Sequence, residues 1–413
     1  MRSGGNERRA LEPENALPPH PPTVPGGPRP SYFSCRHTYE DTLIQEITTR
    51  GPNEHSTVSV ETSSPFPGLV CVENGLGVLP PDYDPAYALQ ALPNCVVVNA
   101  PSIKALAGAV CKALLGEDET ETRETFRKAP RGSLAVHALV PGMFKGQRDP
   151  VSKRRAYTVA DDVAAQLQKI YPAARKRSVD EDSNSGEETE RWVLQLLLLE
   201  PEVMAASLVR CTEVGGRPTW PNWFHPAGFA QVDIEGDMPS SAYRKLLEAF
   251  HCMRDRPPRY LYDDLTPAVV DLGACPGGWT AALRLMGCSV VAVDRSPLDP
   301  TLMFDDKVHF VKGDAFKYEP ELTGSMQNAW MVSDVIAYPE RVGELLDRWC
   351  GGRWAAKMVV TVKFKGEVVA WDELESVMEI AKGHGYTCRA KHFFNNKNEV
   401  TLVSPNDLEG IQK

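Results

Sequence analysis

Apolar runs and helical periodicity alternate along the second half of the chain, which begins near Gly236. Four runs read as buried strands with an aspartate at or close to the end of each: PAVVDLG (267–273), CSVVAVD (288–294), VHFVKGD (308–314) and AWMVSDV (329–335). Helical spacing of apolar residues occurs at 240–253, 279–286 and 340–349. Strands that alternate with helices predict an α/β fold with a doubly wound, mostly parallel sheet. In such sheets, ligands bind at the carboxyl ends of the strands.

The pattern continues to the end of the chain. MVVTVKF (358–364) predicts a fifth strand, WDELESVMEIAKGHGY (371–386) a helix, and 388–394 with 399–405 a terminal pair of strands. We therefore expect residues 236–413 to form one domain.

The first half, residues 31–235, has mixed α/β patterning without a catalytic signature. Strands are expected at 69–75, 95–100, 135–141, 192–201 and 204–216, and helices at 102–116 and 160–172. The run WVLQLLLL (192–199) fits a buried strand. Residues 1–30 hold eight prolines and almost no periodicity, so we expect them to be disordered. By itself this half indicates a binding or scaffolding module.

Composition places the chain among soluble globular proteins. Of its 413 residues, 42% are apolar and 24% charged, and no run of about 18 apolar residues predicts a membrane span. Ten cysteines are scattered without a CxxC pair or a zinc-ligand spacing, so we expect reduced thiols, an intracellular compartment and no metal requirement. Glu7, Glu12 and Glu14 argue against a secretory signal. A cytoplasmic location is expected, with an organelle or the nucleus left open.

The net charge of the chain and its local basic runs point to different kinds of partner. The net charge of −10 does not favour nucleic-acid binding, but acidic runs at 117–124 and 180–190 account for much of it. Basic runs remain at 145–155 and 175–177. Each is either a solvated face or part of a groove that follows phosphates.

The stretch VVDLGACPGGWTAAL (269–283) carries the first chemical signal. An apolar strand ends beside Asp271, three glycines follow, and a helix begins. Glycine allows a sharp turn and a close approach of a ligand to the backbone, and a helix N-terminus favours a negative group. The spacing differs from the G-x-G-x-x-G of dinucleotide sites. The alternative is a tight strand-to-helix turn without a ligand.

The next two strands favour a ligand. Asp294 can accept hydrogen bonds from both hydroxyls of a ribose, and Asp314 from the exocyclic amine of adenine. A ribose, an adenine and a small zwitterion describe S-adenosylmethionine. The residues expected to bind this cofactor are Asp271, Gly273, Cys275, Pro276, Gly277, Gly278, Trp279, Asp294, Asp314 and Asp334. We interpret Cys275 as a space-filling thiol.

The fourth strand bears on the methyl acceptor. SDVIAYP (333–339) lacks the Asn/Asp-Pro-Pro-aromatic run of amino-group methyltransferases, and no cysteine near it can serve carbon-5 cytosine chemistry. Asp334 stands there instead. Lys245, Lys363 and Glu399 lie at ends of elements expected near the same face. Each alone reads as a surface charge, and the ordered set of four predicts a catalytic site.

The chemistry expected of this set is an in-line methyl transfer from a sulfonium to a hydroxyl. Lys363 is the candidate base. A free lysine has a pKa of about 10.4, so neutral lysine at pH 7 costs roughly 4.6 kcal/mol. Lys245 should lower the pKa of Lys363, whereas Asp334 and Glu399 should raise it and orient the lysines. Alignment of the reacting groups can supply on the order of 7–11 kcal/mol, more than the base.

These residues resemble the FtsJ-like family of RNA ribose 2′-O-methyltransferases, whose lysine-aspartate-lysine-glutamate tetrad the four positions match. SSAYRKLLEAF, VDLGACPGGWT, VSDVIAYPERV and NKNEVTLV carry the similarity, over about 240–403. Within the family the chain resembles the bacterial enzymes that modify a cytidine of large-subunit rRNA. The resemblance implies a Rossmann-like domain that uses S-adenosylmethionine. It also implies an N-terminal RNA-binding half with a ferredoxin-like piece and a THUMP domain, which YFSCRHTYEDTLIQEI (32–47) matches only faintly.

Two alternatives stay open. The chain can be an RNA-binding assembly factor that keeps the fold without catalysis, or a methyltransferase of proteins or small molecules. The complete tetrad disfavours the first, and the large N-terminal half disfavours the second. The expected partner is RNA, namely large-subunit rRNA or its precursor particle. The sequence does not determine the nucleotide or the oligomeric state.

Overall fold

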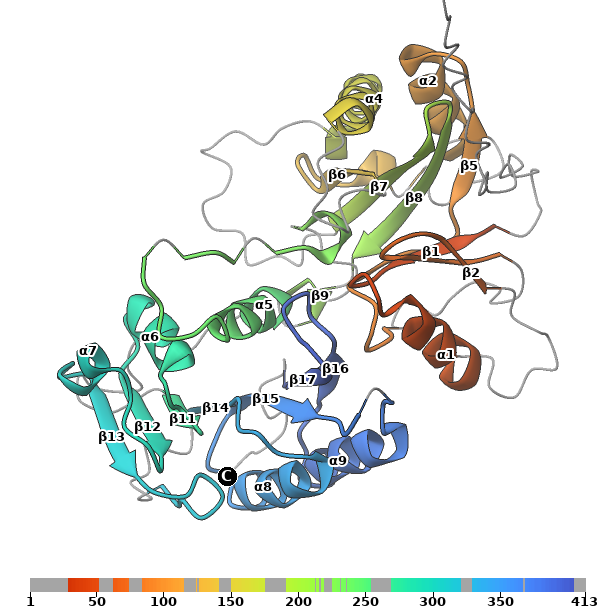
Figure 1. Cartoon of the computed structure of the whole chain (residues 1–413). Helices are drawn as coiled ribbons and strands as arrows, with labels where there is room; N and C mark the ends of the chain where they lie inside the picture. Colours follow the sequence, from red (N-terminus) through yellow and green to blue (C-terminus); the bar gives the residue numbers. More distant parts are fainter. Residues whose placement is uncertain are drawn as a thin grey trace, which may run out of the picture.

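The structure is a computed structural model with three larger sheets and a two-stranded ribbon (Figure 1). It describes residues 29–51, 62–73, 84–114, 124, 126–140, 150–174, 191–211, 213–214, 217–218, 225–230, 232–234, 236–253, 269–320, 329–366 and 368–404. The acidic run 180–190, the basic run 175–177, most of 117–124 and of the proline-rich start, and 145–149 of the other basic run lie outside these residues. No helix in the described part of the chain is long and apolar enough to cross a membrane.

The largest sheet has seven strands in the order β13-β12-β11-β14-β15-β17-β16. Its strands are β11 (Val269–Leu272), β12 (Val290–Asp294), β13 (Val308–Lys312), β14 (Trp330–Ser333), β15 (Lys357–Lys363), β16 (Arg389–Lys391) and β17 (Glu399–Val403). The first five are parallel, and β17 runs antiparallel between β15 and β16. The predicted doubly wound, mostly parallel sheet is confirmed. The strand order reverses between β11 and β14, where a ligand crevice is expected.

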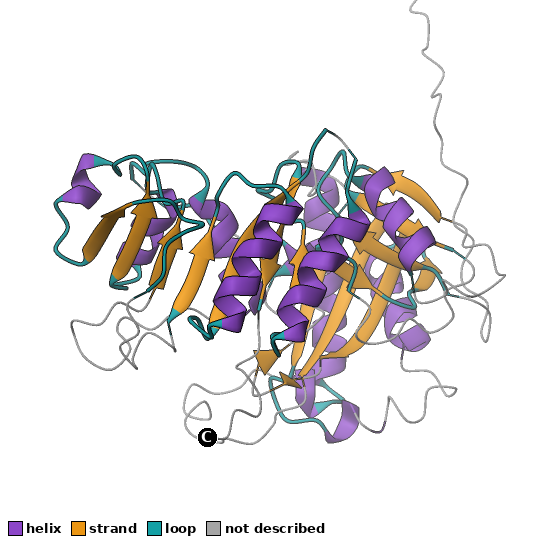
Figure 2. Ribbon diagram, turned by 90° about the horizontal axis from the view of Figure 1, so that it is seen from below, coloured by secondary structure: helices purple, strands orange, loops and turns teal. Residues whose placement is uncertain are grey.

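Helices cover both faces of this sheet. They are α5 (Tyr243–Met253), α6 (Gly278–Leu285), α7 (Pro300–Met303), α8 (Pro339–Gly351) and α9 (Trp371–Gly383). Apolar side chains of α5 and α6 pack with Val269 and Val290 on one face. Those of α8 and α9 pack with Val270 and Val291 on the other, in front of the strands in Figure 2. Successive residues of a strand point to opposite faces, which is why β11 and β12 are apolar almost throughout.

A four-stranded antiparallel sheet, in the order β2-β3-β1-β4, lies between the two other sheets (Figure 1). Its elements are β1 (Ser31–Ser34), α1 (Glu40–Arg50), β2 (Thr62–Phe66), β3 (Leu69–Val72) and β4 (Gln90–Leu92). Phe33 and Val70 join the core under α8 and α9, whereas Tyr32 and Leu69 join a core shared with the third sheet. Burial of both faces makes this sheet a bridge between the two ends of the molecule.

The third sheet has the order β5-β8-β7-β6 and carries two helices. Its elements are β5 (Val96–Asn99), α2 (Ile103–Leu114), β6 (Leu134–Leu139), α4 (Pro150–Gln168), β7 (Arg191–Glu200) and β8 (Val203–Cys211), and the ribbon β9 (Glu213–Val214) with β10 (Arg217–Pro218) follows. The predicted strand at 192–201 is thus confirmed as β7, buried along most of its length. Short 3-10 turns lie at Pro172–Ala174 and Pro226–Gly228.

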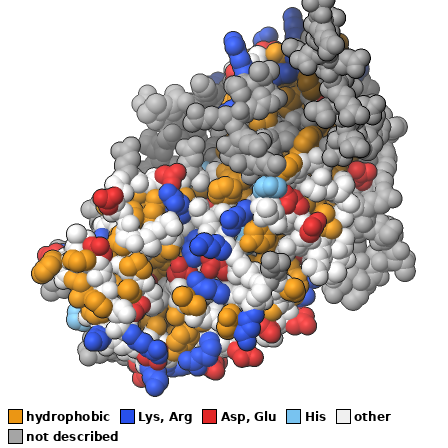
Figure 3. Space-filling view, viewed as in Figure 1, with side chains coloured by type: hydrophobic (Ala, Val, Ile, Leu, Met, Phe, Trp, Pro, Cys, Tyr) orange, Lys and Arg blue, Asp and Glu red, His pale blue; other side chains and the backbone are white. Residues whose placement is uncertain are grey.

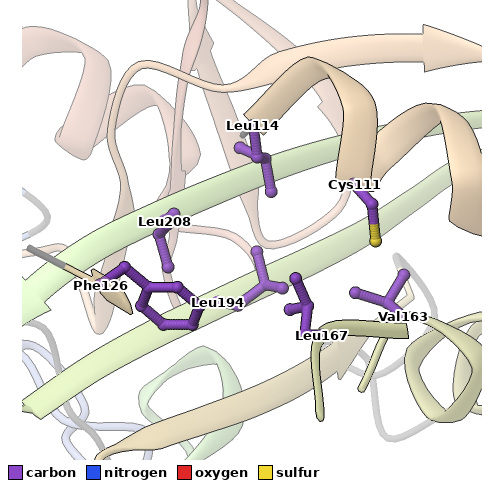
Figure 4. A pocket seen from close by; sticks show the side chains of 7 residues that line it. All are labelled: Cys111, Leu114, Phe126, Val163, Leu167, Leu194 and Leu208. Atoms are coloured by element: carbon purple, nitrogen blue, oxygen red, sulfur yellow. The ribbon is translucent and has the colours of Figure 1, made fainter. Parts of the chain in front are cut away.

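A small apolar cavity lies between α2, α4 and this sheet. Its volume is about 10 Å³, and the side chains in Figure 4 surround it: Cys111, Leu114, Phe126, Val163, Leu167, Leu194 and Leu208. Ligand sites are typically about 300–1,000 Å³ and carry polar groups. This cavity is therefore a gap in core packing.

Candidate active site

The glycine-rich loop follows β11 at the reversal of strand order, and its glycines are required by contacts within the protein. Gly273 and Gly277 have φ of +74° and +112°, which favour glycine. A Cβ at Gly273 would lie 3.0 Å from the Cβ of Val335, and a Cβ at Gly278 would overlap the Oγ of Ser240. The loop therefore closes against the segments before α5 and after β14.

A cavity of about 350 Å³ opens over this loop, within the usual range for small-molecule sites. Its lining residues are Ser240, Ala242, Asp271, Gly273, Ala274, Cys275, Pro276, Gly278, Trp279, Asp294, Asp334, Val335, Ile336 and Lys363. Eight of the ten residues expected to bind the cofactor are among them. Gly277 and Asp314 are not, and Gly277 instead faces Leu302 and Leu298.

The aspartates at the ends of the strands differ in their surroundings. Asp294 accepts hydrogen bonds from the backbone N–H of Cys275 (3.0 Å) and Ser296 (2.8 Å), so it also holds the loop. Asp314 accepts from Arg295 at 2.6 Å and from the N–H of Phe316 at 3.0 Å. These bonds lower the pKa of Asp314. The ion pair is open to solvent, where such pairs contribute little.

Asp271 is buried at the base of the cavity. It accepts a hydrogen bond of 2.6 Å from the hydroxyl of Thr280 on α6. Burial is the largest influence and, together with the charges of Asp334 and Asp294, raises the pKa of Asp271 to about 7 despite this bond. A cationic group bound beside it would favour its charged form.

The four predicted catalytic residues lie together. Lys245 Nζ donates to both oxygens of Asp334 (2.8 Å each) and to Glu399 Oε1 (2.9 Å). Lys363 Nζ lies 3.1 Å from Asp334 Oδ1 and 3.1 Å from Glu399 Oε2. The cluster has two cations and two carboxylates, so it is neutral as a unit. Figure 3 shows Lys and Arg side chains around acidic ones where α5 meets the ends of β15 and β17.

The fold brings these residues together from four elements. Lys363 and Glu399 are directly opposite each other in the antiparallel β15–β17 pair. Asp334 follows β14, the neighbour of β15, and Lys245 lies in the first turn of α5. Lys363 and Asp334 line the cavity, whereas Lys245 and Glu399 are more deeply buried and do not. Lys363 and Asp334 can therefore contact a bound substrate. Lys245 and Glu399 hold these two side chains in place by ion pairs.

Electrostatics in the cluster favour the charged forms of Lys363 and Glu399. Burial opposes the charge of Lys363, but Asp334 and Glu399 outweigh it and raise the pKa of this lysine. Burial likewise opposes the charge of Glu399, but Lys245 and Lys363 lower its pKa to about 2. The expected lowering of the Lys363 pKa by Lys245 does not prevail, because two carboxylates lie within 3.1 Å.

Three further residues support the tetrad, and the sequence pattern did not single them out. Thr361, on β15, donates to Asp334 Oδ1 at 2.8 Å. Asn396 is fully buried, donates to Thr401 at 3.1 Å and lies 3.5 Å from Glu399 Oε1. Glu248, one turn after Lys245 on α5, accepts from the N–H of Phe394 and Asn395. Spacing of three residues from a tetrad member was the only available signal for Asn396 and Glu248.

Comparison with known proteins finds a family match within this half of the chain. Residues 240–344 match the family model described as "FtsJ-like methyltransferase". The chain is 32% identical over 185 residues to the ribosomal RNA large subunit methyltransferase M of Marinomonas sp. strain MWYL1, which covers 43% of this chain and 51% of the relative. The protein of the same name from Shewanella pealeana is 32% identical over 182 residues, covering 42% and 49%. The chain thus spans about half the length of the curated relatives it matches.

Similar solved structures include a possible methylase from Clostridium difficile 630, with a TM-score of 0.30, 10% identity and coverage of 94% of this chain and 100% of that chain. The magnesium protoporphyrin IX methyltransferase of Synechocystis with bound S-adenosylmethionine has a TM-score of 0.27, 13% identity and coverage of 41% and 86%. Similarity at this level carries no conclusion about the chain. The match over 240–344 confirms the expected resemblance to FtsJ-like methyltransferases over these residues.

Proposed function

We propose that the protein methylates a ribose 2′-hydroxyl in RNA, namely that of a cytidine in large-subunit rRNA. The observation that carries the proposal is the neutral Lys-Asp-Lys-Glu cluster, two of whose members line the cavity beside the glycine-rich loop. The FtsJ-like match and the names of the relatives support the same reaction class. The rRNA substrate and the cytidine come from the resemblance to these relatives.

The cavity fits S-adenosylmethionine, which supplies an electrophilic methyl group when bound. Asp294 lies at the end of β12 with its carboxylate toward the loop, where it can accept from a ribose hydroxyl. The N-terminus of α6 lies beside Gly278 and can hold a carboxylate. Asp271 offers a counter-charge to an amino group. Asp314 lies outside the cavity lining, and an adenine amine would reach it only in exchange for its exposed partner Arg295.

Lys363 and Asp334 are suited to hold the acceptor hydroxyl. An ammonium has three N–H donors, and Lys363 uses two of them on Asp334 and Glu399. The third can be donated to a hydroxyl oxygen in the cavity. Asp334 Oδ2 is within hydrogen-bond distance of Lys245 alone among the described side chains, so it can also accept a hydrogen bond from the hydroxyl. Alignment of the hydroxyl is the main contribution we assign to the cluster.

Lys363 is also the proposed acceptor of the hydroxyl proton as the new O–C bond forms. Its raised pKa leaves only a small neutral fraction at pH 7. Below that pKa the neutral fraction grows about tenfold per pH unit, so the rate of the chemical step should rise with pH between 7 and 9. A rate that does not change over this range would remove the base role and leave the role in alignment.

We further propose that residues 31–235 bind RNA and that residues 236–413 are the catalytic domain. The order β2-β3-β1-β4 with α1 after β1 agrees with a ferredoxin-like unit, and β5 to β8 with α2 and α4 are assigned to the THUMP-like unit. Free cysteines such as Cys71 and Cys350 support the proposed reducing, cytoplasmic location.

The test is transfer of labelled methyl from S-adenosylmethionine to large-subunit rRNA from cells that lack the protein. Modified riboses are mapped by their resistance to alkaline cleavage. We expect one protected site with the wild type. Lys363→Ala should lower the single-turnover rate by about 10²–10⁴-fold and leave cofactor affinity nearly unchanged. Lys382→Ala, an exposed lysine on α9, is the matched control.

Three outcomes would contradict the proposal. Normal activity of Lys363→Ala would refute the role of this lysine. Cofactor binding without a product on rRNA or on a precursor particle would favour an assembly factor. Methyl transfer to protein in a ribonuclease-treated lysate would favour another acceptor class.

A further inference from the structure

An apolar side chain stands in solvent at the mouth of the cavity. Ile336 is 87% exposed, yet it lines the cavity together with Asp334 and Lys363. Tyr338, two residues further on, is 47% exposed. Large exposed apolar side chains at the edge of a binding site indicate a surface that a partner covers.

A lysine stands beside this tyrosine. Lys365 Nζ lies 4.8 Å from the centre of the Tyr338 ring. Lys365 comes two residues after Lys363, and the N–H of Lys363 donates to the carbonyl of Ala337 at 3.3 Å. This hydrogen bond joins the segment after β14 to the end of β15, next to the tetrad. Two extended residues span at most about 7 Å between Cα atoms, so Lys365 begins close to Lys363 of the tetrad.

An intramolecular role does not account for the arrangement. An exposed cation–π pair contributes only about 0.5–1 kcal/mol. Tyr338 precedes the first turn of α8, but its side chain makes no capping hydrogen bond. Neither contact explains why Ile336 is held in solvent.

We infer that Ile336, Tyr338 and Lys365, here called the rim triad, bind the nucleotide next to the methylated ribose. The inference rests on the proposed function. The Tyr338 ring stacks on the base, Lys365 meets a phosphate, and Ile336 contacts the edge of the base. Stacking on an aromatic ring needs an unpaired base, so the target lies in a single-stranded segment or a loop.

Substitution of the ring tests the triad in the full-length protein with the same rRNA. Tyr338→Ala should raise the KM for rRNA about tenfold or more, because loss of one stacked base weakens binding to that extent. The kcat at saturating rRNA and the affinity for S-adenosylmethionine should not change. Tyr338→Phe keeps the ring and should behave like the wild type. Phe304→Ala removes an exposed aromatic that does not line the cavity and is the control.

Substitution of the lysine gives an independent readout. Lys365→Ala should lower the slope of log affinity against log salt concentration by about one unit. Unchanged KM in Tyr338→Ala and an unchanged slope in Lys365→Ala, with an active wild type, would overturn the triad and leave the proposed function standing. A wild type without any RNA product would instead refute the function first. A Tyr338→Ala protein that loses kcat or cofactor affinity would also refute the assignment, since the ring would then act inside the cavity.

Discussion

Asp334 shows how one side chain sets the state of the site. It accepts from Lys245, Lys363 and Thr361, all within 3.1 Å, and faces the cavity. Asp334 and Glu399 hold both lysines by ion pairs, and their charges raise the pKa of Lys363. The sequence placed an aspartate after the fourth strand and a lysine at the end of the fifth. The direction of the Lys363 pKa shift depends on distances between side chains from four elements, which no local pattern contains.

At the residue scale, Asp271 allows the effect of burial on the pKa of a carboxyl group to be tested. Its pKa of about 7 in the folded protein exceeds the ordinary value of about 3.9. The folded state therefore keeps a proton that the unfolded chain has lost, and stability falls as pH rises from about 4 through about 7. Asp271→Asn removes this loss of stability with rising pH. The Tm of the variant minus the Tm of the wild type should therefore increase from pH 5 to pH 8. Thermal unfolding at a series of pH values measures it.

The control for this prediction is Asp314→Asn. Hydrogen bonds from Arg295 and Phe316 lower the pKa of Asp314, so the stability it adds is lost only under acid. The Tm difference of this variant should stay constant from pH 5 to pH 8. A constant difference for Asp271→Asn as well would show that its carboxyl is ionised throughout.

At the scale of elements, side chains of α5 hold the turn between β16 and β17. Lys245 on α5 reaches Glu399, the first residue of β17, while Glu248 on the same helix accepts from the backbone of the turn. The N-terminal region adds a contact, because the hydroxyl of Tyr39 donates to the carbonyl of Lys397 at 2.9 Å. Helical periodicity predicted α5, but only the folded chain shows which turn the helix holds.

We predict that Glu248 positions the tetrad. Glu248→Ala removes the acceptor of two backbone N–H groups, each bond contributing about 0.5–1.5 kcal/mol. The kcat should fall about tenfold, with unchanged affinity for S-adenosylmethionine because Glu248 does not line the cavity. Steady-state kinetics with cofactor titration separates the two quantities. Glu344→Ala, exposed on α8, is the control, and an unchanged kcat in Glu248→Ala would exclude the positioning role.

For the whole molecule, the β2-β3-β1-β4 sheet shares a buried core with the seven-stranded sheet. Leu43, Ile47 and Tyr87 share one buried cluster with residues of α8 and α9. Beside it, Asp84 pairs with Arg389 and Lys391 of β16. A chain that starts at residue 236 would expose this cluster, so RNA binding is better tested in the full-length protein.

The ion cluster around Asp84 gives a prediction at this scale. Lys391 is buried, and Asp84→Ala would remove the carboxylate that pairs with both Lys391 and Arg389. Removal of one partner of a buried pair costs about 3–5 kcal/mol. Denaturant unfolding should show a loss of that size. Glu319→Ala, which breaks an exposed pair with Arg348, should change the free energy of unfolding by less than about 1 kcal/mol. A similarly small effect of Asp84→Ala would mean that these ion pairs do not stabilise the fold.

The sequence by itself determined most of the strands and helices, the glycine-rich turn and the four charged positions, because periodicity and loop chemistry depend on neighbours along the chain. It did not predict β2, β4 or α7, and it placed the start of α4 ten residues too late. The tertiary structure decided what depends on contacts between distant segments. It inserted β17 between β15 and β16, which places Glu399 opposite Lys363. It buried both faces of β1, and it brought two carboxylates to Lys363 so that their charge outweighs its burial. Burial and Coulomb interactions act through space, so they are fixed only when the chain has folded.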